Sequence, residues 1–353
     1  MSTLDTDLVV RTVGPEDQPA VLDLLRGALG QGPAGDITDD FYRWKHIDSP
    51  FGRSPGLLAS HEGQVVGVRL LMRWRLEVLG QSVQAVRAVD TATHPAYQGR
   101  GIFRMLTLEL LRRLEDAAEI DLVFNTPNAS SRPGYLKMGW QSVGRVPIRL
   151  SPVRPLSVAA GARQALGTTA DVSGGPARSH ASRPVRECRF DPVVVLLADR
   201  ADEVATLLSE SAHSPRFHTP LTLQYLTWRY GQAPGLDYRF VPLESAGRLT
   251  GFAIGRMRSR GPLSEFTVAE LVVREGDFRG ARRLLCRVRA SGADHVTIHT
   301  TSGSEADRTA LVAGYLPVPR YGLGLVTNAR ATLPLDPVDL RSWRLSLGDL
   351  EVF

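Results

Sequence analysis

The stretch HPAYQGRGIFRML, residues 94–106, constrains the fold more than any other, because two glycines stand where a helix is about to begin. The preceding AVRAVDTAT is typical of a strand, and apolar residues recur at helical spacing from Ile102 onward. Glycine weakens a helix and is rarely kept in its first turn unless the backbone needs that freedom. Free N–H groups of such a loop and of the first helical turn, together with the helix dipole, form an anion site that suits a pyrophosphate. From the loop alone, a plain strand-to-helix turn is an equal alternative.

The order of the predicted elements around this turn indicates an α+β fold with a mostly antiparallel sheet. A short strand near residue 9 precedes a helix over 18–29, and residues 56–93 contain three or four strands separated by glycine-containing turns. The helix that follows the turn is amphipathic, and DLVFNTP after it is typical of a buried strand. A short helix in SSRPGYLKMGW ends at Gly139.

Two segments match motifs of a known family. Gln98 and Gly101 fit the pattern [Gln/Arg]-x-x-Gly-x-[Gly/Ala], in which Phe103 replaces the usual small residue. Further along, NASSRPGYLKMGW fits Asn-x-x-[Ala/Ser]-x-x-x-Tyr-x-x-x-Gly-[Phe/Trp], and the matching residues are Asn128, Ser131, Tyr135, Gly139 and Trp140. In this order the motifs resemble those of the GNAT superfamily of N-acetyltransferases. The resemblance covers residues 8–150 well and residues 190–328 weakly.

The resemblance implies an acyl-CoA site, with acetyl-CoA as co-substrate. It places the pantetheine arm along a strand edge and the pyrophosphate on the glycine loop. The residues concerned are Thr91, Ala92, Thr93, Gln98, Gly99, Arg100, Gly101, Ile102, Phe103 and Asn128. It also implies that Tyr135 is the general acid that protonates the departing sulfur. The alternative for Tyr135 is a buried aromatic residue that anchors its helix.

The acceptor amine must be neutral when it reacts, so a nearby group should accept its proton. Asp90, at the start of the cofactor strand, is the candidate, acting directly or through water. A carboxylate that faces solvent or bonds a turn is the alternative. The last residues, GDLEVF, are a second source of a carboxylate, which the sequence does not rank against Asp90.

Two further stretches lie upstream of the cofactor strand. FYRWKH, residues 41–46, is aromatic and basic, and it either lines an acceptor pocket or packs a helix. GRSPG, residues 52–56, matches the elbow of serine hydrolases, but Pro55 after Ser54 has no N–H group for an oxyanion. The sequence therefore argues against a hydrolase.

The second half of the chain repeats features of the first at an offset of 184 residues, with Trp44 on Trp228 and Lys45 on Arg229. We therefore expect an N-terminal GNAT domain with the acetyl-CoA site (1–150), a linker or surface insertion (151–188), a degenerate C-terminal GNAT-like domain (189–330) and a tail (331–353). In the second copy, Asp277 adds negative charge to the phosphate loop, and Leu311 or Val312 stands where the tyrosine would be. The copies should form a monomer with an internal pseudo-dimer.

Composition and charge limit the kinds of binding partner that we expect for this chain. The 353 residues carry a net charge of +5 without a run of basic residues, so we expect no nucleic acid. Apolar runs are too short for a membrane helix, so we expect no membrane either. Two cysteines, Cys188 and Cys286, indicate neither a disulfide framework nor a metal cluster. MSTLDTDLVV lacks the basic and apolar regions of a signal peptide, and we expect a cytoplasmic protein.

The resemblance to the GNAT superfamily implies that the chain is an acetyl-CoA-dependent N-acetyltransferase. Its acceptor would be a primary amine on a small molecule, such as an amino sugar, a secondary metabolite or an amino-acid derivative. One alternative is transfer of a longer acyl chain. The other is a non-catalytic module that binds acyl-CoA as a sensor or in an assembly.

Overall fold

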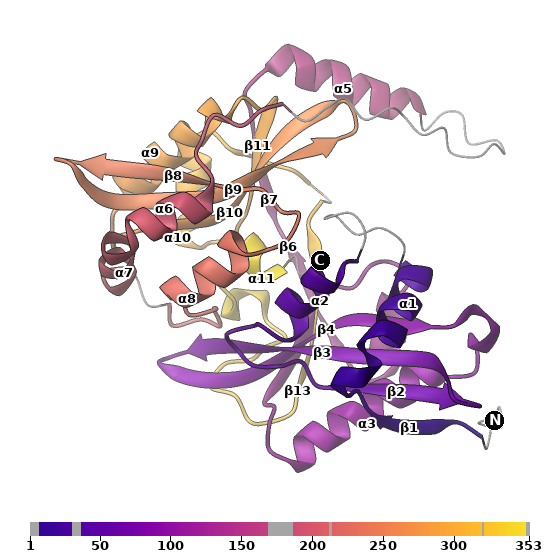
Figure 1. Ribbon diagram of the computed structural model, residues 1–353. Coiled ribbons are helices and arrows are strands. Elements are labelled where there is room, and N and C mark those ends of the chain that lie inside the picture. The colour runs from indigo at the N-terminus through magenta and orange to yellow at the C-terminus, as the bar shows by residue number, and fades with distance from the viewer. Residues whose placement is uncertain (1–6, 30–36, 169–185, 212–213, 320, 351–353) are drawn as a thin grey trace.

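The computed structural model describes residues 7–29, 37–168, 186–211, 214–319 and 321–350, and it contains two β-sheets. The first sheet has the strand order β1-β2-β3-β4-β5-β13-β6, and the second has the order β12-β7-β11-β10-β9-β8. Two pairs, β4–β5 and β10–β11, are parallel, and the other named strand pairs are antiparallel. The predicted α+β fold with mostly antiparallel sheets is confirmed. In Figure 1 the sheets lie apart, with short helices between them.

The strands of the first sheet are β1 (Val9–Thr12), β2 (Gly56–His61), β3 (Gln64–Val78), β4 (Gln81–Thr93), β5 (Leu122–Asn125), β6 (Gln141–Val146) and β13 (Leu323–Ala329). Those of the second are β7 (Ile148–Pro152), β8 (Tyr238–Ser245), β9 (Arg248–Arg260), β10 (Leu263–Val273), β11 (His295–His299) and β12 (Leu316–Pro317). The helices are α1 (Gln18–Leu29), α2 (Asp39–His46), α3 (Ile102–Asp116), α4 (Arg132–Lys137), α5 (Pro155–Thr168), α6 (Val193–Asp199), α7 (Ala201–Ser209), α8 (Leu223–Leu226), α9 (Phe278–Arg287), α10 (Glu305–Val312) and α11 (Leu347–Leu350).

Helices cover both faces of the first sheet at its centre. Leu71 and Ala88 pack with α3, whereas Val68 and Leu70 pack with α1 on the opposite face. The alternation of strand side chains sends neighbouring residues to opposite faces, so both faces bury apolar residues. This is why buried residues follow one another without alternation at 66–72 in β3 and at 85–88 in β4.

The second sheet repeats the connections of the first. In each sheet two antiparallel pairs, β2–β3–β4 or β8–β9–β10, lead through a helix, α3 or α9, to a parallel strand, β5 or β11. A second short helix, α4 or α10, then follows. Both long central strands also carry a bulge, at Val89–Asp90 in β4 and at Ala269 in β10. The two halves therefore have matching local topology.

The two halves exchange strands. β13, which lies late in the chain, fills the first sheet between β5 and β6. In return β7 joins the second sheet and pairs with β11 and β12. The sheets do not divide at the predicted boundaries near residues 150 and 188, so that division stays a proposal for the segments outside the exchanged strands. Residues 169–185 of the predicted linker lie outside the described residues, and α5 precedes them.

The largest apolar cluster joins the two halves. The rings of Trp44 and Trp228 stack with centroids 5.3 Å apart, and each indole Nε1 donates to the backbone carbonyl of the other, at 2.7 and 2.8 Å. The predicted tail takes part as well, because Trp343, Leu345, Leu347 and Leu350 are buried in the same cluster. Residues 343–350 are therefore a structural element of the interface between the halves.

Candidate functional site

The site is built on the divergence of β4 from β5. The two strands pair in parallel only from Ala85 to Arg87, opposite Leu122 to Phe124. Beyond Arg87 the strand bulges and continues as far as Thr93, paired on its other side with β3 alone. Within the described residues, the backbone edge of the predicted Thr91, Ala92 and Thr93 is thus left without a strand on the β5 side. We call this region the β4–β5 divergence.

The N-terminus of α3 opens next to this edge. Gly101 is the N-cap with φ +83° and makes no side-chain cap, and Gly99 has φ +78°. Such angles favour glycine, and a Cβ atom built on either residue meets nothing within 4 Å. The first N–H groups of α3, including that of Ile102, therefore keep their capacity to bind an anion.

The loop before α3 is held by its own side chains. Gln98 Nε2 donates to the carbonyl of Thr93 at 3.3 Å, which ties the loop to the end of β4. Arg100 donates to the carbonyl of Ala96 at 3.2 Å, and its guanidinium lies 4.7 Å from the ring centre of Tyr97. Gln98 and Arg100 thus fix the backbone that carries the glycines.

Phe103 departs from the family pattern for a reason that lies on α4. Its ring packs edge-on against Tyr135 at 5.6 Å, and a Cβ on Gly134 would lie 3.1 Å from it. The glycine in α4 therefore makes room for the large side chain in α3. Phe103 faces Tyr135, next to the turn that carries the free N–H groups.

Tyr135 is buried on the α3 face of the sheet. Its ring stacks on Trp140 at 4.3 Å, and its hydroxyl oxygen accepts a hydrogen bond from Arg69 at 3.1 Å. Asn128 starts the helix that carries it, because its side-chain oxygen accepts from the N–H and the hydroxyl of Ser131. Asn128 thereby positions Tyr135, and its predicted contact with the cofactor stays a prediction.

Asp90 lies at the bulge of β4 and contacts α2 on the opposite face. Its carboxylate accepts from Lys45 Nζ at 2.9 Å and bonds His46 Nε2 at 2.7 Å, and it keeps 17% of its side chain exposed. Burial acts to raise the pKa of Asp90, but the charge of Lys45 and the hydrogen bond with His46 outweigh it and hold that pKa well below its usual range. Asp90 is therefore ionised.

His46 connects the Asp90 carboxylate to Ser54 through two hydrogen bonds. Burial lowers the pKa of His46 and outweighs the opposing effect of Asp90, so the imidazole is neutral at pH 7. The Nε2–H group of His46 then donates a hydrogen bond to the ionised Asp90, and Nδ1 accepts one from the Ser54 hydroxyl at 3.0 Å. Ser54, His46 and Asp90 form a line of hydrogen bonds, while the N–H of Ser54 is bonded to the carbonyl of His46.

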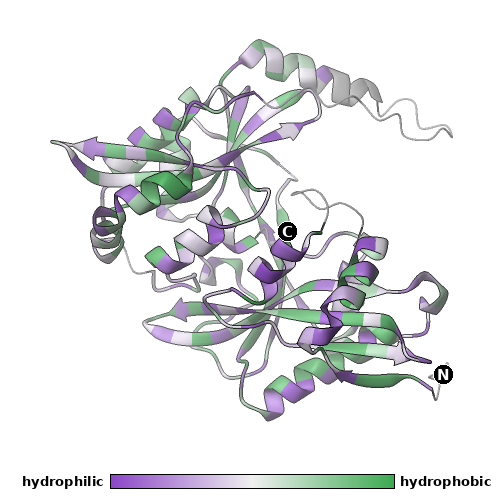
Figure 2. Cartoon of the chain, in the orientation of Figure 1, coloured by the Kyte–Doolittle hydropathy of each residue, from purple (hydrophilic) through white to green (hydrophobic). Residues whose placement is uncertain are grey.

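Lys45 and His46 belong to FYRWKH, which the sequence left open between an acceptor pocket and helix packing, but their pairing with Asp90 was not predicted. Figure 2 shows α2 as a mostly hydrophilic helix, yet five of its eight residues are buried, including Lys45 and His46. A polar helix that is nevertheless buried is a signal of a polar network, but it needs the structure to be recognised. Arg69 was also missed, since a lone arginine in an apolar strand carries no motif.

The C-terminal segment reaches the same region from the other half. The carbonyl of Leu350 accepts from Arg87 at 2.9 Å and from the hydroxyl of Thr126, just after β5, at 2.8 Å. Within GDLEVF, Asp349 is buried and bonds Thr219 and the N–H of Ser346. Residues 351–353 of that predicted carboxylate source lie outside the described residues.

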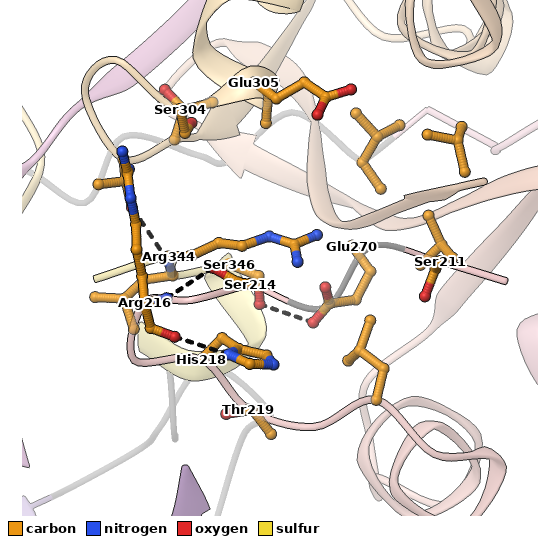
Figure 3. A pocket seen from close by; sticks show the side chains of 18 of the residues that line it. Ser211, Ser214, Arg216, His218, Thr219, Glu270, Ser304, Glu305, Arg344 and Ser346 are labelled. Carbon is orange, nitrogen blue, oxygen red and sulfur yellow. Dashed lines mark hydrogen bonds between the residues drawn. The ribbon is translucent and has the colours of Figure 1, made fainter. Parts of the chain in front are cut away.

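The second half holds a cavity of about 590 Å³ where β10 diverges from β11. Figure 3 shows the side chain of Arg344 extending across it between Glu305 and Glu270, and Ser346 bonded to Glu270. At the corresponding α9 terminus, the carboxylate of Asp277 accepts from the N–H of Gly280 at 2.8 Å. The two helix ends thus differ: α3 has no side-chain cap, and α9 has one.

Among the described residues, no helix is both long and apolar enough to cross a membrane, and no three His, Cys, Asp or Glu side chains are grouped to hold a metal ion.

Comparison with known proteins agrees with this geometry. Residues 9–143 match the family model described as an acetyltransferase (GNAT) domain. A probable N-acyltransferase from Enterococcus faecalis V583 is 14% identical, covers 92% of this chain and 73% of its own, and has a TM-score of 0.62. A GCN5-related N-acetyltransferase from Anabaena variabilis has the same identity and coverage, with a TM-score of 0.59. Saccharomyces cerevisiae N-myristoyltransferase with bound myristoyl-CoA is 13% identical, covers 99% and 90%, and has a TM-score of 0.55. No curated protein sequence matches.

Proposed function

Since residues 9–143 match the model of a GNAT acetyltransferase domain, we propose that this protein transfers the acetyl group of acetyl-CoA to a primary amine on a small molecule. The observation that carries the proposal is the arrangement at the β4–β5 divergence. An uncapped helix end, a free strand edge and a buried phenol with its oxygen held in place lie around one point of the sheet.

The donor would be held by backbone rather than by charge alone. The N–H groups at the start of α3 and the loop from Gln98 to Gly101 would bind the pyrophosphate, and the edge of Thr91 to Thr93 would bind the pantetheine amides. Arg100 would add a cation near the phosphates, since its guanidinium lies on the ring of Tyr97 in the same loop.

The two proton-handling groups lie on opposite faces of the sheet. Tyr135, on the α3 face, would give its proton to the leaving sulfur. Asp90, on the α2 face, would take a proton from the amine through water. Because its pKa is low, Asp90 would not retain that proton and would release it to water, while Lys45 and His46 hold its carboxylate in place.

The contacts between the C-terminal segment and the first half favour a small acceptor. The carbonyl of Leu350 accepts from Arg87 and Thr126, so the C-terminal segment contacts the end of β5, where it would restrict access to the site. The second half would serve as a built-in partner of the catalytic half, in a cytoplasmic monomer with an internal pseudo-dimer.

Transfer of a longer acyl chain is the second candidate. A solved structure that resembles this chain over 99% of its length contains myristoyl-CoA, which makes a longer donor the natural competitor of acetyl-CoA. A non-catalytic acyl-CoA sensor is the third, and the retention of Tyr135 in a held position argues against it.

The deciding experiment incubates the full chain with acetyl-CoA and a panel of small amines and detects both the acetylated amine and free CoA by mass spectrometry. We expect turnover of at least one amine, with acetyl-CoA preferred over octanoyl-CoA and myristoyl-CoA. A preference for the long donors would support the second candidate, and tight acetyl-CoA binding without any turnover would support the sensor.

A further inference from the structure

Arg69, in β3, is a buried cation without a counter-ion. Its side chain is fully buried, and among the described residues no carboxylate pairs with it. The guanidinium instead lies against the rings of Phe103 and Tyr135, at 5.7 and 5.5 Å. Burying an unpaired charge is costly, so a chain that keeps one there has a use for it.

The hydrogen bonds of Arg69 point to that use. One nitrogen, NH1, donates to the carbonyl of Val89, at the bulge of β4, and to the hydroxyl oxygen of Tyr135, both at 3.1 Å. Two others, Nε and NH2, have no hydrogen-bond partner in the described part of the chain. Arg69 therefore links the bulge of the β4–β5 divergence to the phenol oxygen of Tyr135.

Donation by Arg69 also orients the phenol. An arginine has no acceptor atom, so the hydroxyl proton of Tyr135 cannot point back along this bond. The phenol oxygen accepts from the arginine, and its own proton is left to be donated elsewhere. With Trp140 and Phe103 packed against the ring, that proton has a restricted set of directions.

A simple comparison of acids shows why a cation is needed here. A free phenol, with a pKa of about 10, is a weaker acid than a free thiol, at about 8.5, so proton transfer from phenol to thiolate is unfavourable without help. A guanidinium that donates to the phenol oxygen stabilises the phenolate that remains and so favours the transfer.

Resting on the proposed function, we propose that Arg69 is a positioning residue that acts through Tyr135 to make protonation of the leaving thiolate favourable. In the step concerned, the amine nitrogen forms a bond to the acetyl carbon and the carbon–sulfur bond breaks. The sulfur takes the phenol proton of Tyr135, and the phenolate is held by Arg69. The amine loses its own proton on the Asp90 side, and the phenolate is reprotonated from water before the next turnover.

The test compares two donors that differ in their need for a proton. Acetyl-CoA releases an alkyl thiolate, whereas S-(4-nitrophenyl) thioacetate releases an aryl thiolate that is stable without protonation. The full chain, Arg69→Met and Arg69→Lys are assayed with the same amine and both donors. Arg87→Met is a control for the cost of removing a fully buried arginine, because Arg87 contacts Leu350 and does not touch Tyr135.

We expect Arg69→Met to lower kcat with acetyl-CoA by about 10- to 100-fold while KM for acetyl-CoA stays within about threefold. With the aryl thioester the loss should be less than about threefold. Arg69→Lys should recover part of the acetyl-CoA rate, and Arg87→Met should affect both donors to the same extent.

An equal loss with both donors in Arg69→Met would overturn the inference and leave the proposed function intact. No turnover by the unaltered chain with any amine would overturn both. If Arg69→Met fails to fold, Arg69→Lys and Arg69→Gln are assayed with the same two donors instead. An equal loss of rate with both donors in either variant would then overturn the inference.

Discussion

Tyr135 is the residue on which the proposed chemistry depends most directly. Replacing it with phenylalanine keeps the ring that stacks on Trp140 and packs against Phe103, and removes only the hydroxyl. We expect Tyr135→Phe to lower kcat by about 100-fold with little change in acetyl-CoA affinity, because the proton donor is lost and the packing is not. Steady-state kinetics together with a direct binding measurement check this. A kcat within twofold of the parent, with chemistry rate-limiting, would assign Tyr135 a structural role.

Gly101 tests the phosphate site. A glutamate at this position would place a carboxylate beside the free N–H groups of α3, so we expect Gly101→Glu to abolish acetyl-CoA binding in a calorimetric titration. The backbone angle alone would also strain the variant, and Gly63 controls for this strain. Gly63 has φ +82° with nothing within 4 Å of an added Cβ, and it lies in the β2–β3 turn. Normal affinity in Gly63→Glu and in Gly101→Glu alike would contradict the site.

Residues inside a motif were predictable, and residues that act through space were not. The positions from Gln98 to Phe103 and Tyr135 follow from spacing along the chain. Lys45 and His46 come to the site from α2, in a stretch noted for its aromatic and basic residues but without a predicted partner, and Arg69 comes from β3, where no motif marks it. Asp90 is an intermediate case, because its place beside the cofactor strand was foreseeable but its pairing with α2 was not.

At the scale of elements, the two equivalent helices differ at their N-terminal ends. α3 begins at a glycine without a side-chain cap, whereas Asp277 caps α9 and occupies an N–H group that a phosphate would need. We therefore expect one acetyl-CoA per chain by isothermal titration calorimetry. Asp277→Ala should cost about 1 kcal/mol of stability through the lost cap and should not create a second site. A stoichiometry near two in the unaltered chain would contradict this account.

Glu270, next to the bulge of β10, is a carboxylic acid with a raised pKa. Glu270 is buried, accepts from the hydroxyls of Tyr230 and Ser346, and lies near Asp349. Burial and the charge of Asp349 raise the pKa of Glu270 to about 7. The folded chain therefore holds a proton that the unfolded chain, with a glutamate pKa of about 4.3, has lost, and stability falls as pH rises through about 7.

Glu270→Gln should remove this pH dependence. We expect the loss of unfolding free energy between pH 5 and pH 8 to be smaller in the variant by up to about 3 kcal/mol, since the shift spans more than two pKa units. Urea denaturation at several pH values measures it. Glu275→Gln, at an exposed position just beyond the same strand, should leave the pH dependence as it is. An unchanged slope in Glu270→Gln would show that the carboxyl is not the group responsible.

The element order was predictable because periodicity and turn residues act locally. The helix at α3, the short helix ending before Gly139 and the strands between 56 and 93 are all placed as the patterns indicated. The partners of each strand depend on contacts between distant segments. No local pattern marks β13 as the neighbour of β5, or β7 as a member of the second sheet.

At the scale of the whole molecule, neither half is complete alone. A fragment of residues 1–150 lacks β13, so β5 and β6 would face each other across a missing strand, and Trp44 would lose its stacking partner. We expect this fragment to aggregate or to show no cooperative unfolding in circular dichroism, and to have no acetyltransferase activity. Co-expression with residues 151–353 should restore soluble complex. An active, folded 1–150 fragment would show that the exchanged strand is dispensable.

The late position of β13 in the chain also determines when the first sheet can be completed during synthesis. A ribosome has made most of the chain, through β12, before the strand that separates β5 from β6 exists. Until then both strands present unpaired edges, the kind of surface that draws chains together. Pairing of Val326 with Asn125 closes a loop of about two hundred residues, and such distant contacts form slowly. A slow stretch of translation between β6 and β13 should therefore prolong the exposure of these edges, whereas a slow stretch before β5 should not.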